Sequence, residues 1–117
     1  MIAKMTNKDE NFYKYMGKIF GSRLIQNQTN DRIYDDNNKV WYLGIEEETV
    51  VAFVSVSNDV IKNIYGTKDE TLEEILKEVK KENKIKDSTV TMLYEDLYKK
   101  VGFKVAKDIY KNFVVIS

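Results

Sequence analysis

A short helical pattern that stops at a glycine constrains the fold of this chain more than any other stretch. Its apolar residues recur at helical spacing, at Leu93, Leu97 and Val101. Gly102 follows where a helix can end in a left-handed residue, and Phe103 then opens an alternating run toward Val105 and the segment 113–116. The pattern predicts a helix over 94–101 that is followed directly by two terminal strands.

The middle of the chain has the composition of an antiparallel meander. The segments 40–45 and 49–57 are rich in aromatic and β-branched residues, which favour strands, and 60–65 is a third strand candidate. The acidic segment 46–48 joins the first two, and the Asn-Asp pair at 58–59 suits a two-residue turn with positive φ. We expect three neighbouring strands connected by tight hairpins.

An amphipathic helix is predicted before the meander, after a strand candidate at 1–5. Its cap is Thr6 or Asn7, with Asp9 and Glu10 in the acidic first turn that helices favour. One face carries the apolar residues Phe12, Met16, Ile19 and Phe20. This stripe indicates a helix that packs on the core, with a second helical turn after it.

A second helix is predicted after the meander. Thr67 and Glu70 have the spacing of a capping box, in which each side chain satisfies a free amide of the helix start. The apolar stripe consists of Leu72, Ile75, Leu76 and Val79. The helix is expected to end near Asn83, and the segment 88–92 is a further strand candidate.

Composition limits the chemistry that the chain can perform. The 117 residues include no cysteine and no histidine, which removes thiol nucleophiles, histidine-activated nucleophiles and the usual zinc ligands, and we predict no metal site. Charge balances at 19 basic against 19 acidic side chains, so no overall field favours nucleic acid or a membrane as partner. The longest apolar runs, such as 50–54, are far short of a membrane span. We expect one cytoplasmic domain over 1–117.

The segment 97–103, Leu-Tyr-Lys-Lys-Val-Gly-Phe, resembles the closing motif of the GCN5-related N-acetyltransferase (GNAT) superfamily, roughly Leu-Tyr-x-x-x-Gly-Phe. The predicted order of elements is also similar to that family over nearly the whole chain. The resemblance implies an α+β fold, an α/β arrangement of three layers. Its central sheet is mixed, mostly antiparallel, has about six or seven strands and is flanked by helices.

The same resemblance implies transfer of an acetyl group from acetyl-CoA to an amine on a small molecule or a protein. Tyr98 matches the tyrosine that protonates the departing CoA thiolate in that family. Its ring also suits core packing with the hydroxyl at the surface, so both roles stay open. A splayed sheet is expected to form the thioester cleft, and the head of the following helix to bind the pyrophosphate. The residues implied to bind acetyl-CoA are Tyr65, Gly66, Thr67, Lys68 and Lys99.

The head of that helix departs from the family's glycine-rich pattern and leaves an alternative open. Its first turns carry Asp69, Glu70, Glu73 and Glu74, which repel a pyrophosphate. The alternative is a catalytically inactive GNAT-like binding or regulatory module, able to form a homodimer through exposed strands. The acidic segment 31–48 would favour a cationic amine if it borders the acceptor site, or is a solvated loop. Loose candidates for a general base are Glu47, Glu48 and Asp59.

Overall fold

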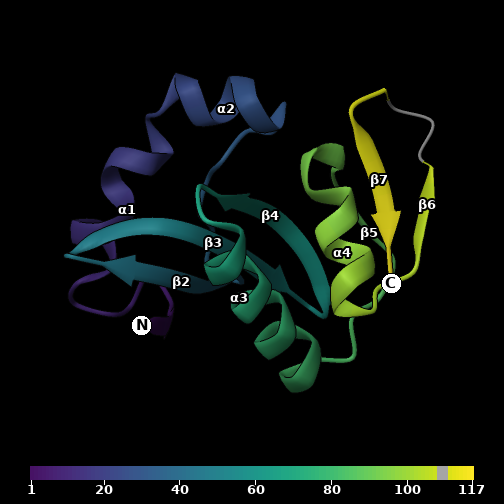
Figure 1. The fold of residues 1–117 in the computed structure, drawn as a ribbon. Coiled ribbons are helices and arrows are strands. Elements are labelled where there is room, and N and C mark those ends of the chain that lie inside the picture. The colour runs from purple at the N-terminus through teal and green to yellow at the C-terminus, as the bar shows by residue number, and fades with distance from the viewer. Residues whose placement is uncertain (108–110) are drawn as a thin grey trace.

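Four antiparallel strands form the larger of two sheets. In the computed structural model, which describes residues 1–107 and 111–117, these strands are neighbours in chain order (Figure 1). Their bounds are Ile2–Met5 (β1), Val40–Glu46 (β2), Thr49–Ser57 (β3) and Val60–Gly66 (β4). The hairpins between β2, β3 and β4 turn through residue pairs with positive φ, at 47–48 and 58–59, which suits the right-handed twist of the strands. The predicted meander is confirmed.

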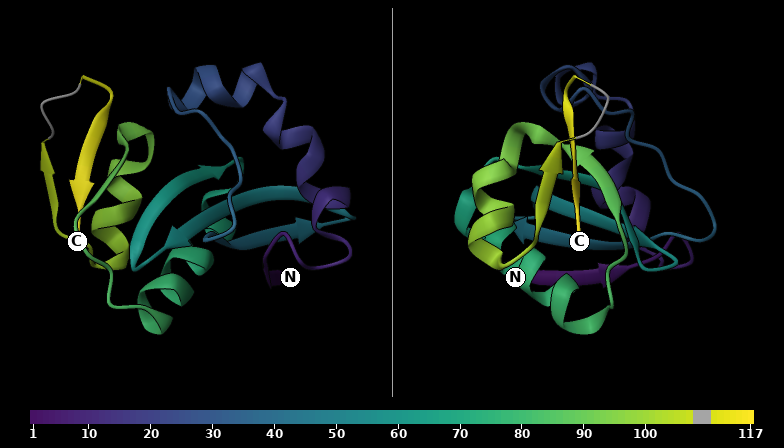
Figure 2. Two further views of the ribbon diagram at one scale, coloured as in Figure 1. Left: turned by 180° about the vertical axis from the view of Figure 1, so that it is seen from behind. Right: turned by 90° about the vertical axis from the view of Figure 1, so that its right-hand side faces the viewer.

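The other three strands form a separate sheet. β5 (Ser88–Thr91) and β6 (Val105–Lys107) each pair antiparallel with β7 (Phe113–Ile116), which lies between them. This smaller sheet stands beside the larger one (Figures 1 and 2). The predicted fold class is confirmed, and the described residues form seven strands that are divided over two sheets. The division falls between β4 and β5.

Helices cover both faces of the larger sheet. They are α1 (Phe12–Phe20), α2 (Arg23–Thr29), α3 (Asp69–Glu82) and α4 (Glu95–Val101), with the 3-10 helix η1 (Met92–Tyr94) leading into α4. α1 and α2 lie on one face, while α3 lies on the other and contacts α4 (Figures 1 and 2). Gly102 ends α4 with a φ of 103°, the left-handed residue predicted at this position.

Alternating side chains of the strands divide the core between the two faces. Toward α1 and α2, the ring of Phe53 lies 5.7 Å from that of Trp41 and 5.5 Å from that of Tyr65, centroid to centroid. Toward α3, Tyr42 and Val54 pack against its apolar stripe. The members of that stripe, Leu72, Ile75, Leu76 and Val79, are fully buried. In α1, Phe12, Met16 and Ile19 are buried and the partly buried Phe20 packs against them. The predicted apolar faces of both helices are therefore confirmed.

Two predicted helix starts are wrong, because other contacts use the side chains that were expected to cap them. Residues 7–11 form turns, in which Thr6 Oγ1 accepts from the Lys8 amide at 3.3 Å and Asn7 Nδ2 donates to Asn37 Oδ1 at 3.1 Å, so α1 begins only at Phe12. The predicted capping box is absent. The Thr67 hydroxyl donates to the carbonyl of Val51 at 3.1 Å, which extends the contact between β3 and β4 and leaves α3 without a side-chain cap.

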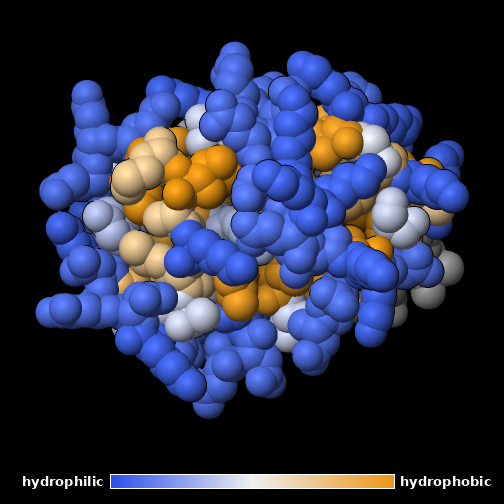
Figure 3. Space-filling view, turned by 90° about the horizontal axis from the view of Figure 1, so that it is seen from below, coloured by the Kyte–Doolittle hydropathy of each residue, from blue (hydrophilic) through white to orange (hydrophobic). Residues whose placement is uncertain are grey.

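The surface below α3 is mainly hydrophilic. Seen from that side, charged and polar residues predominate and apolar residues form separate patches between them (Figure 3). Lys77 and Glu73 form an i,i+4 pair at 3.2 Å along the helix, the kind of exposed pair that adds little stability. No helix among the described residues has the length and apolar character needed to span a bilayer.

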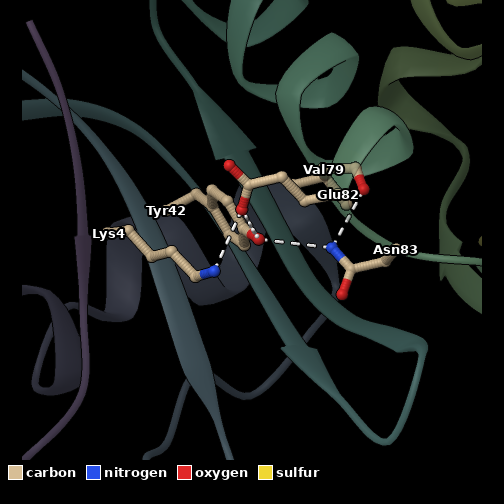
Figure 4. A network of polar contacts seen from close by, with 5 residues as sticks. All are labelled: Lys4, Tyr42, Val79, Glu82 and Asn83. Carbon is tan, nitrogen blue, oxygen red and sulfur yellow. Dashed lines mark hydrogen bonds and ion pairs between the residues drawn. The ribbon is translucent and has the colours of Figure 1, made fainter.

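A polar cluster fastens the C-terminal end of α3 to the strands (Figure 4). Lys4 Nζ and the Tyr42 hydroxyl both donate to Glu82 Oε1, at 3.0 and 2.8 Å. Asn83 Nδ2 donates to the carbonyl of Val79 at 2.9 Å and to the Tyr42 hydroxyl at 3.2 Å. The hydrogen bond from Lys4, followed by that from Tyr42, lowers the pKa of Glu82 to about 2. The cluster ties α3 to β1 and β2, and so fixes the helix whose other end borders the site below.

Candidate functional site

β4 and β5 lie side by side at their starts and belong to different sheets beyond them. The Lys86 amide donates to the carbonyl of Asp59 at 2.8 Å, and the Ile61 amide donates to the Ser88 hydroxyl at 2.9 Å. Past these contacts β4 continues in the larger sheet while β5 pairs with β7. No backbone ladder joins β4 to β5 among the described residues. The two strands therefore part toward Gly66.

A cavity of about 520 Å³ lies at this parting, within the roughly 300–1,000 Å³ usual for small-molecule sites. We call it the donor cleft. Its lining comes from α2, the end of β4, the start of α3 and η1, and consists of Gln28, Tyr65, Gly66, Thr67, Asp69, Leu93 and Tyr94. The polar lining groups are hydroxyls, one carboxamide, one carboxylate and backbone. No lysine or arginine lines it, so the donor cleft offers no fixed positive charge to an anion.

Within the lining of the donor cleft, Tyr94 joins η1 to the end of β4. Its hydroxyl accepts a hydrogen bond from the Gly66 amide at 3.0 Å and donates one to the Gly66 carbonyl at 3.2 Å. Gly66 stands opposite Ala52 in the β3–β4 register, while both of its backbone groups face η1 on the other side. Burial raises the pKa of the Tyr94 hydroxyl, so this group is a neutral phenol that both donates and accepts.

Gly66 is also a point of close packing between β4 and α3. A Cβ atom at this position would lie 3.0 Å from Cβ and 3.1 Å from Cδ2 of Leu72, and 3.3 Å from Cβ of Ala52. Such distances are tighter than ordinary van der Waals contacts, so a side chain here would push α3 away from the sheet. The absence of a Cβ sets the distance between the strand end and the helix start.

Tyr98, the predicted general acid, lies outside the lining of the donor cleft. It is fully buried in the core shared with α3, and its hydroxyl donates to the carbonyl of Thr91 at 2.7 Å. Burial raises the pKa of this phenol, which makes it a weaker acid. In this geometry Tyr98 joins α4 to the end of β5. Its catalytic role stays a prediction.

Of the five residues predicted to bind acetyl-CoA, three meet in the donor cleft and two lie elsewhere. Tyr65, Gly66 and Thr67 line it. Tyr65 is 8% exposed, and among the described residues its hydroxyl has no hydrogen-bond partner within the protein. Lys68 pairs with Glu46 at the β2–β3 hairpin. Lys99 stands 3.6 Å from Glu95 on the surface of α4. Both lysines are thus engaged by carboxylates.

A second depression, of about 370 Å³, runs between α3 and α4 and borders the donor cleft at Asp69. We call it the acidic groove, and its lining consists of Asp69, Glu70, Glu73, Asp96, Leu97 and Lys100. Lys100 Nζ lies 2.8 Å from Glu73 Oε1, and this hydrogen bond lowers the pKa of Glu73. The groove therefore presents net negative charge at the head of α3, where the resemblance implies a pyrophosphate site.

The predicted acidic rim is used largely to fix a loop. Asn63 of β4 donates through Nδ2 to Asp31 at 3.0 Å and accepts through Oδ1 from Lys39 at 2.9 Å. Trp41 Nε1 donates to Asp35 at 2.8 Å. No residue of 31–48 lines the donor cleft, and neither does Asp59, which lies at the opposite end of β4. The loose candidates for a general base are therefore not brought to the cleft.

Sequence reasoning missed Gln28, Leu93 and Tyr94 as members of the site. Gln28 belongs to α2, and a single glutamine in a polar segment carries no motif signal. Leu93 and Tyr94 were read as the start of the last helix, whereas they form the 3-10 turn that faces β4. A signal was available for Tyr94, because it stands one helical turn before Tyr98 and soon after β5 ends at Thr91. Within residues 1–107 and 111–117, no cluster of acidic side chains has the arrangement to hold a metal ion.

Comparison with known proteins identifies this architecture. No protein-family model matches the chain, and no curated protein matches it. Two solved structures resemble it over nearly their full length. ElaA from Escherichia coli matches with a TM-score of 0.63 and 11% identity, over 99% of this chain and 97% of that one. An N-acetyltransferase from Staphylococcus aureus Mu50 matches with a TM-score of 0.63 and 16% identity, over 99% and 93%.

The chain has a GNAT-like fold. The predicted fold resemblance is thereby confirmed. At these identities the likeness concerns the path of the backbone, so the chemistry of this GNAT-like chain has to be argued from its own side chains. The parting of β4 and β5 is a feature of the backbone, whereas the Tyr94 contact, the acidic groove and the engaged lysines depend on the side chains of this chain.

Proposed function

We propose that the protein is an acyltransferase that moves an acetyl group from acetyl-CoA to an amine. The observation that carries this proposal is the donor cleft, a cavity of about 520 Å³ at the parting of β4 and β5. The fold also supports the proposal, because one similar structure is an N-acetyltransferase. A cytoplasmic location remains a prediction.

The transfer requires four changes at the thioester. The amine nitrogen bonds to the thioester carbon, the C–S bond breaks with its electron pair on sulfur, the thiolate takes a proton, and the nitrogen gives one up. Tyr98 remains the proposed source of the thiolate proton, on condition that its hydroxyl turns away from the carbonyl of Thr91, 2.7 Å distant. Asp69 is the carboxylate of the cleft lining, and we assign it to accept the proton from nitrogen.

The proposed acceptor is a cationic amine of a small molecule or a protein. The lining of the donor cleft contains a carboxylate, at Asp69, and no cationic side chain, so an ammonium group is favoured over an anion. The ammonium loses one proton to solvent before its nitrogen attacks the thioester, and the second proton, released after attack, is the one assigned to Asp69. Tyr65 and Gln28 add a hydroxyl and a carboxamide to the same lining. Both can accept a hydrogen bond from a nitrogen.

A second candidate function is the non-catalytic GNAT-like module, possible as a homodimer. The observation that favours it is the acidic groove, in which Glu73 engages the one lining lysine, Lys100. Its predicted consequence is that CoA thioesters do not bind. A single measurement, the binding of acetyl-CoA, therefore distinguishes the two candidate functions.

Thermal unfolding in a titration with acetyl-CoA separates them. A ligand present at about 100 times its Kd stabilises the native state by roughly 2.7 kcal/mol, which raises the unfolding temperature by several degrees. We expect a saturable shift with acetyl-CoA, followed by release of free thiol when an amine such as spermidine or polylysine is added. A chain that shows no shift at millimolar acetyl-CoA is not an acetyltransferase, and the binding-module function then holds.

A further inference from the structure

Tyr94 occupies the backbone groups that an extended ligand would bind at the end of β4. The Gly66 amide and carbonyl both face η1, and the Tyr94 hydroxyl satisfies them at 3.0 and 3.2 Å. In a continuous sheet a neighbouring strand would take those two bonds. Extended ligands add to an open strand edge through the same pair of groups. The tyrosine hydroxyl thus stands in for one amide of such a ligand.

The surroundings of Gly66 suit a neutral chain. Among the described residues, the lining of the donor cleft consists of hydroxyls, a carboxamide, the apolar side chain of Leu93 and one carboxylate, that of Asp69, with no lysine or arginine. Tyr65 adds a phenol that is 8% exposed and, among the described residues, has no hydrogen-bond partner within the protein. Because Tyr65 lines the cleft, its hydroxyl is available to hydrogen-bond a ligand. A chain that carries amides can bond both the Gly66 backbone and the Tyr65 hydroxyl.

The exit from the donor cleft is unsuited to phosphates. Asp69 lines both the cleft and the acidic groove, so a donor that leaves the cleft along α3 passes this carboxylate first. Beyond it stand Glu70, Glu73 and Asp96. The nearby cations are engaged, since Lys100 lies 2.8 Å from Glu73 and Lys68 pairs with Glu46. A pyrophosphate in the groove would meet like charge.

We propose that the protein recognises its acyl donor through the neutral pantetheine arm, which displaces the Tyr94 hydroxyl from Gly66, and that the phosphates of the donor add no affinity. This inference rests on the proposed function and specifies its donor. The substrate class is a thioester on a pantetheine arm, with the nucleotide of CoA left outside the groove. In the absence of the arm, the Tyr94 hydroxyl stays hydrogen-bonded to Gly66. We call this contact the latch.

Two donors that share the arm and differ in the nucleotide test the inference. ¹⁵N-labelled protein is titrated with acetyl-CoA and, separately, with S-acetylpantetheine, and the Gly66 amide resonance reports occupancy. We expect both donors to shift this resonance, with dissociation constants that differ by less than about tenfold. An advantage of tenfold or more for acetyl-CoA overturns the inference, because the phosphates would then be recognised.

The latch is tested with Tyr94→Phe, which keeps the ring and removes the hydroxyl. Both donors should bind this variant more tightly, by the same factor, since neither has to break the bonds to Gly66. Tyr13→Phe is the matched control, because Tyr13 is 57% exposed on α1 and does not line the cleft. Weaker binding to Tyr94→Phe would show that the hydroxyl belongs to the bound state and would overturn the latch.

The same titrations separate this inference from the proposed function. If neither donor shifts the Gly66 resonance at millimolar concentration, in the wild type or in Tyr94→Phe, the proposed acetyl transfer fails and this inference fails with it. If acetyl-CoA binds and S-acetylpantetheine does not, acetyl transfer stands and the inference alone is overturned. Similar affinities for the two donors support both.

Discussion

The donor cleft and the acidic groove are neighbours, joined at Asp69, yet they differ in how much negative charge they present. The cleft presents the backbone of Gly66, neutral polar groups and the single carboxylate of Asp69, and arises because β4 and β5 belong to different sheets. The groove presents carboxylates from the surfaces of α3 and α4. Strand topology fixes the first, whereas surface side chains fix the second and can change without changing the fold. A similar fold is therefore better evidence for a similar cleft than for a similar groove.

The largest effect on stability and donor affinity is expected from Gly66→Ala, which alters the cleft and leaves the charge of the groove unchanged. The added Cβ would lie 3.0 Å from Leu72 Cβ, and overpacking of this kind costs about 1–3 kcal/mol of unfolding free energy. Because α3 must move, binding of either donor should weaken as well. Urea denaturation and donor titration measure the two consequences.

Gly17→Ala is the matched control for that substitution. Gly17 lies within α1, and a Cβ there would have no neighbour within 4 Å. Replacing a helical glycine by alanine raises stability by roughly 0.4–1 kcal/mol. The two variants should therefore shift the urea midpoint in opposite directions. A stable Gly66→Ala protein with unchanged donor affinity would contradict the importance of close packing at the cleft.

Tyr98→Phe should have the next largest effect on stability. It also tests whether Tyr98 has a structural role or a catalytic one. The substitution leaves the buried carbonyl of Thr91 without the hydroxyl that it accepts at 2.7 Å, a loss of about 1–3 kcal/mol of unfolding free energy. Donor affinity should not change, since Tyr98 does not line the cleft. If turnover per folded molecule is also unchanged, Tyr98 is structural and the predicted general acid is wrong.

Much of the fold could be predicted from local patterns. The strand meander, the stripe of α3 and the glycine at the end of α4 follow from periodicity and from the conformational freedom of Gly102. The helix starts could not be predicted in the same way. Thr6 and Thr67 have suitable capping chemistry, but the Thr6 hydroxyl accepts from the Lys8 amide and the Thr67 hydroxyl donates to the carbonyl of Val51. Propensity does not specify which of several nearby partners a hydroxyl or carboxylate takes.

The site was predictable only where it lies on one continuous segment. Tyr65, Gly66 and Thr67 were named because they precede a helix, and they do line the cleft. The contact of Tyr94 with Gly66 joins residues 28 positions apart, and no spacing rule connects them. The lysines failed for a different reason. Lys68 was expected at a phosphate, but the β2–β3 hairpin brings Glu46 to it. Charge pairing across elements depends on tertiary placement.

A smaller effect is expected from Glu73→Gln, which alters the groove and leaves the cleft unchanged. It removes one negative charge and frees Lys100, now 2.8 Å from that carboxylate. Acetyl-CoA affinity should rise about two- to fivefold at low salt, and S-acetylpantetheine affinity should not change. Glu74→Gln is the matched control, since Glu74 carries the same charge on α3 without lining the groove. An equal gain for both donors would show that the two regions are not independent.

The smallest effect is expected on the loss of folding stability at low pH, and it concerns Glu82, at the end of α3 that faces away from the groove. Hydrogen bonds from Lys4 and Tyr42 lower the pKa of Glu82 from the model-compound value of 4.5 to about 2. A carboxyl whose pKa is lower in the folded state stabilises that state above pH 4.5, and this contribution is lost as the pH falls through about 2.

Urea midpoints measured from pH 6 to pH 2 should fall less steeply in Glu82→Gln than in the wild type. Because Glu82 is engaged by Lys4 and Tyr42 while the groove acids face an open depression, Glu82→Gln should change the acid limb and leave the affinity ratio of the two donors unaltered. Identical slopes in the two proteins would mean that the cluster in Figure 4 does not anchor α3.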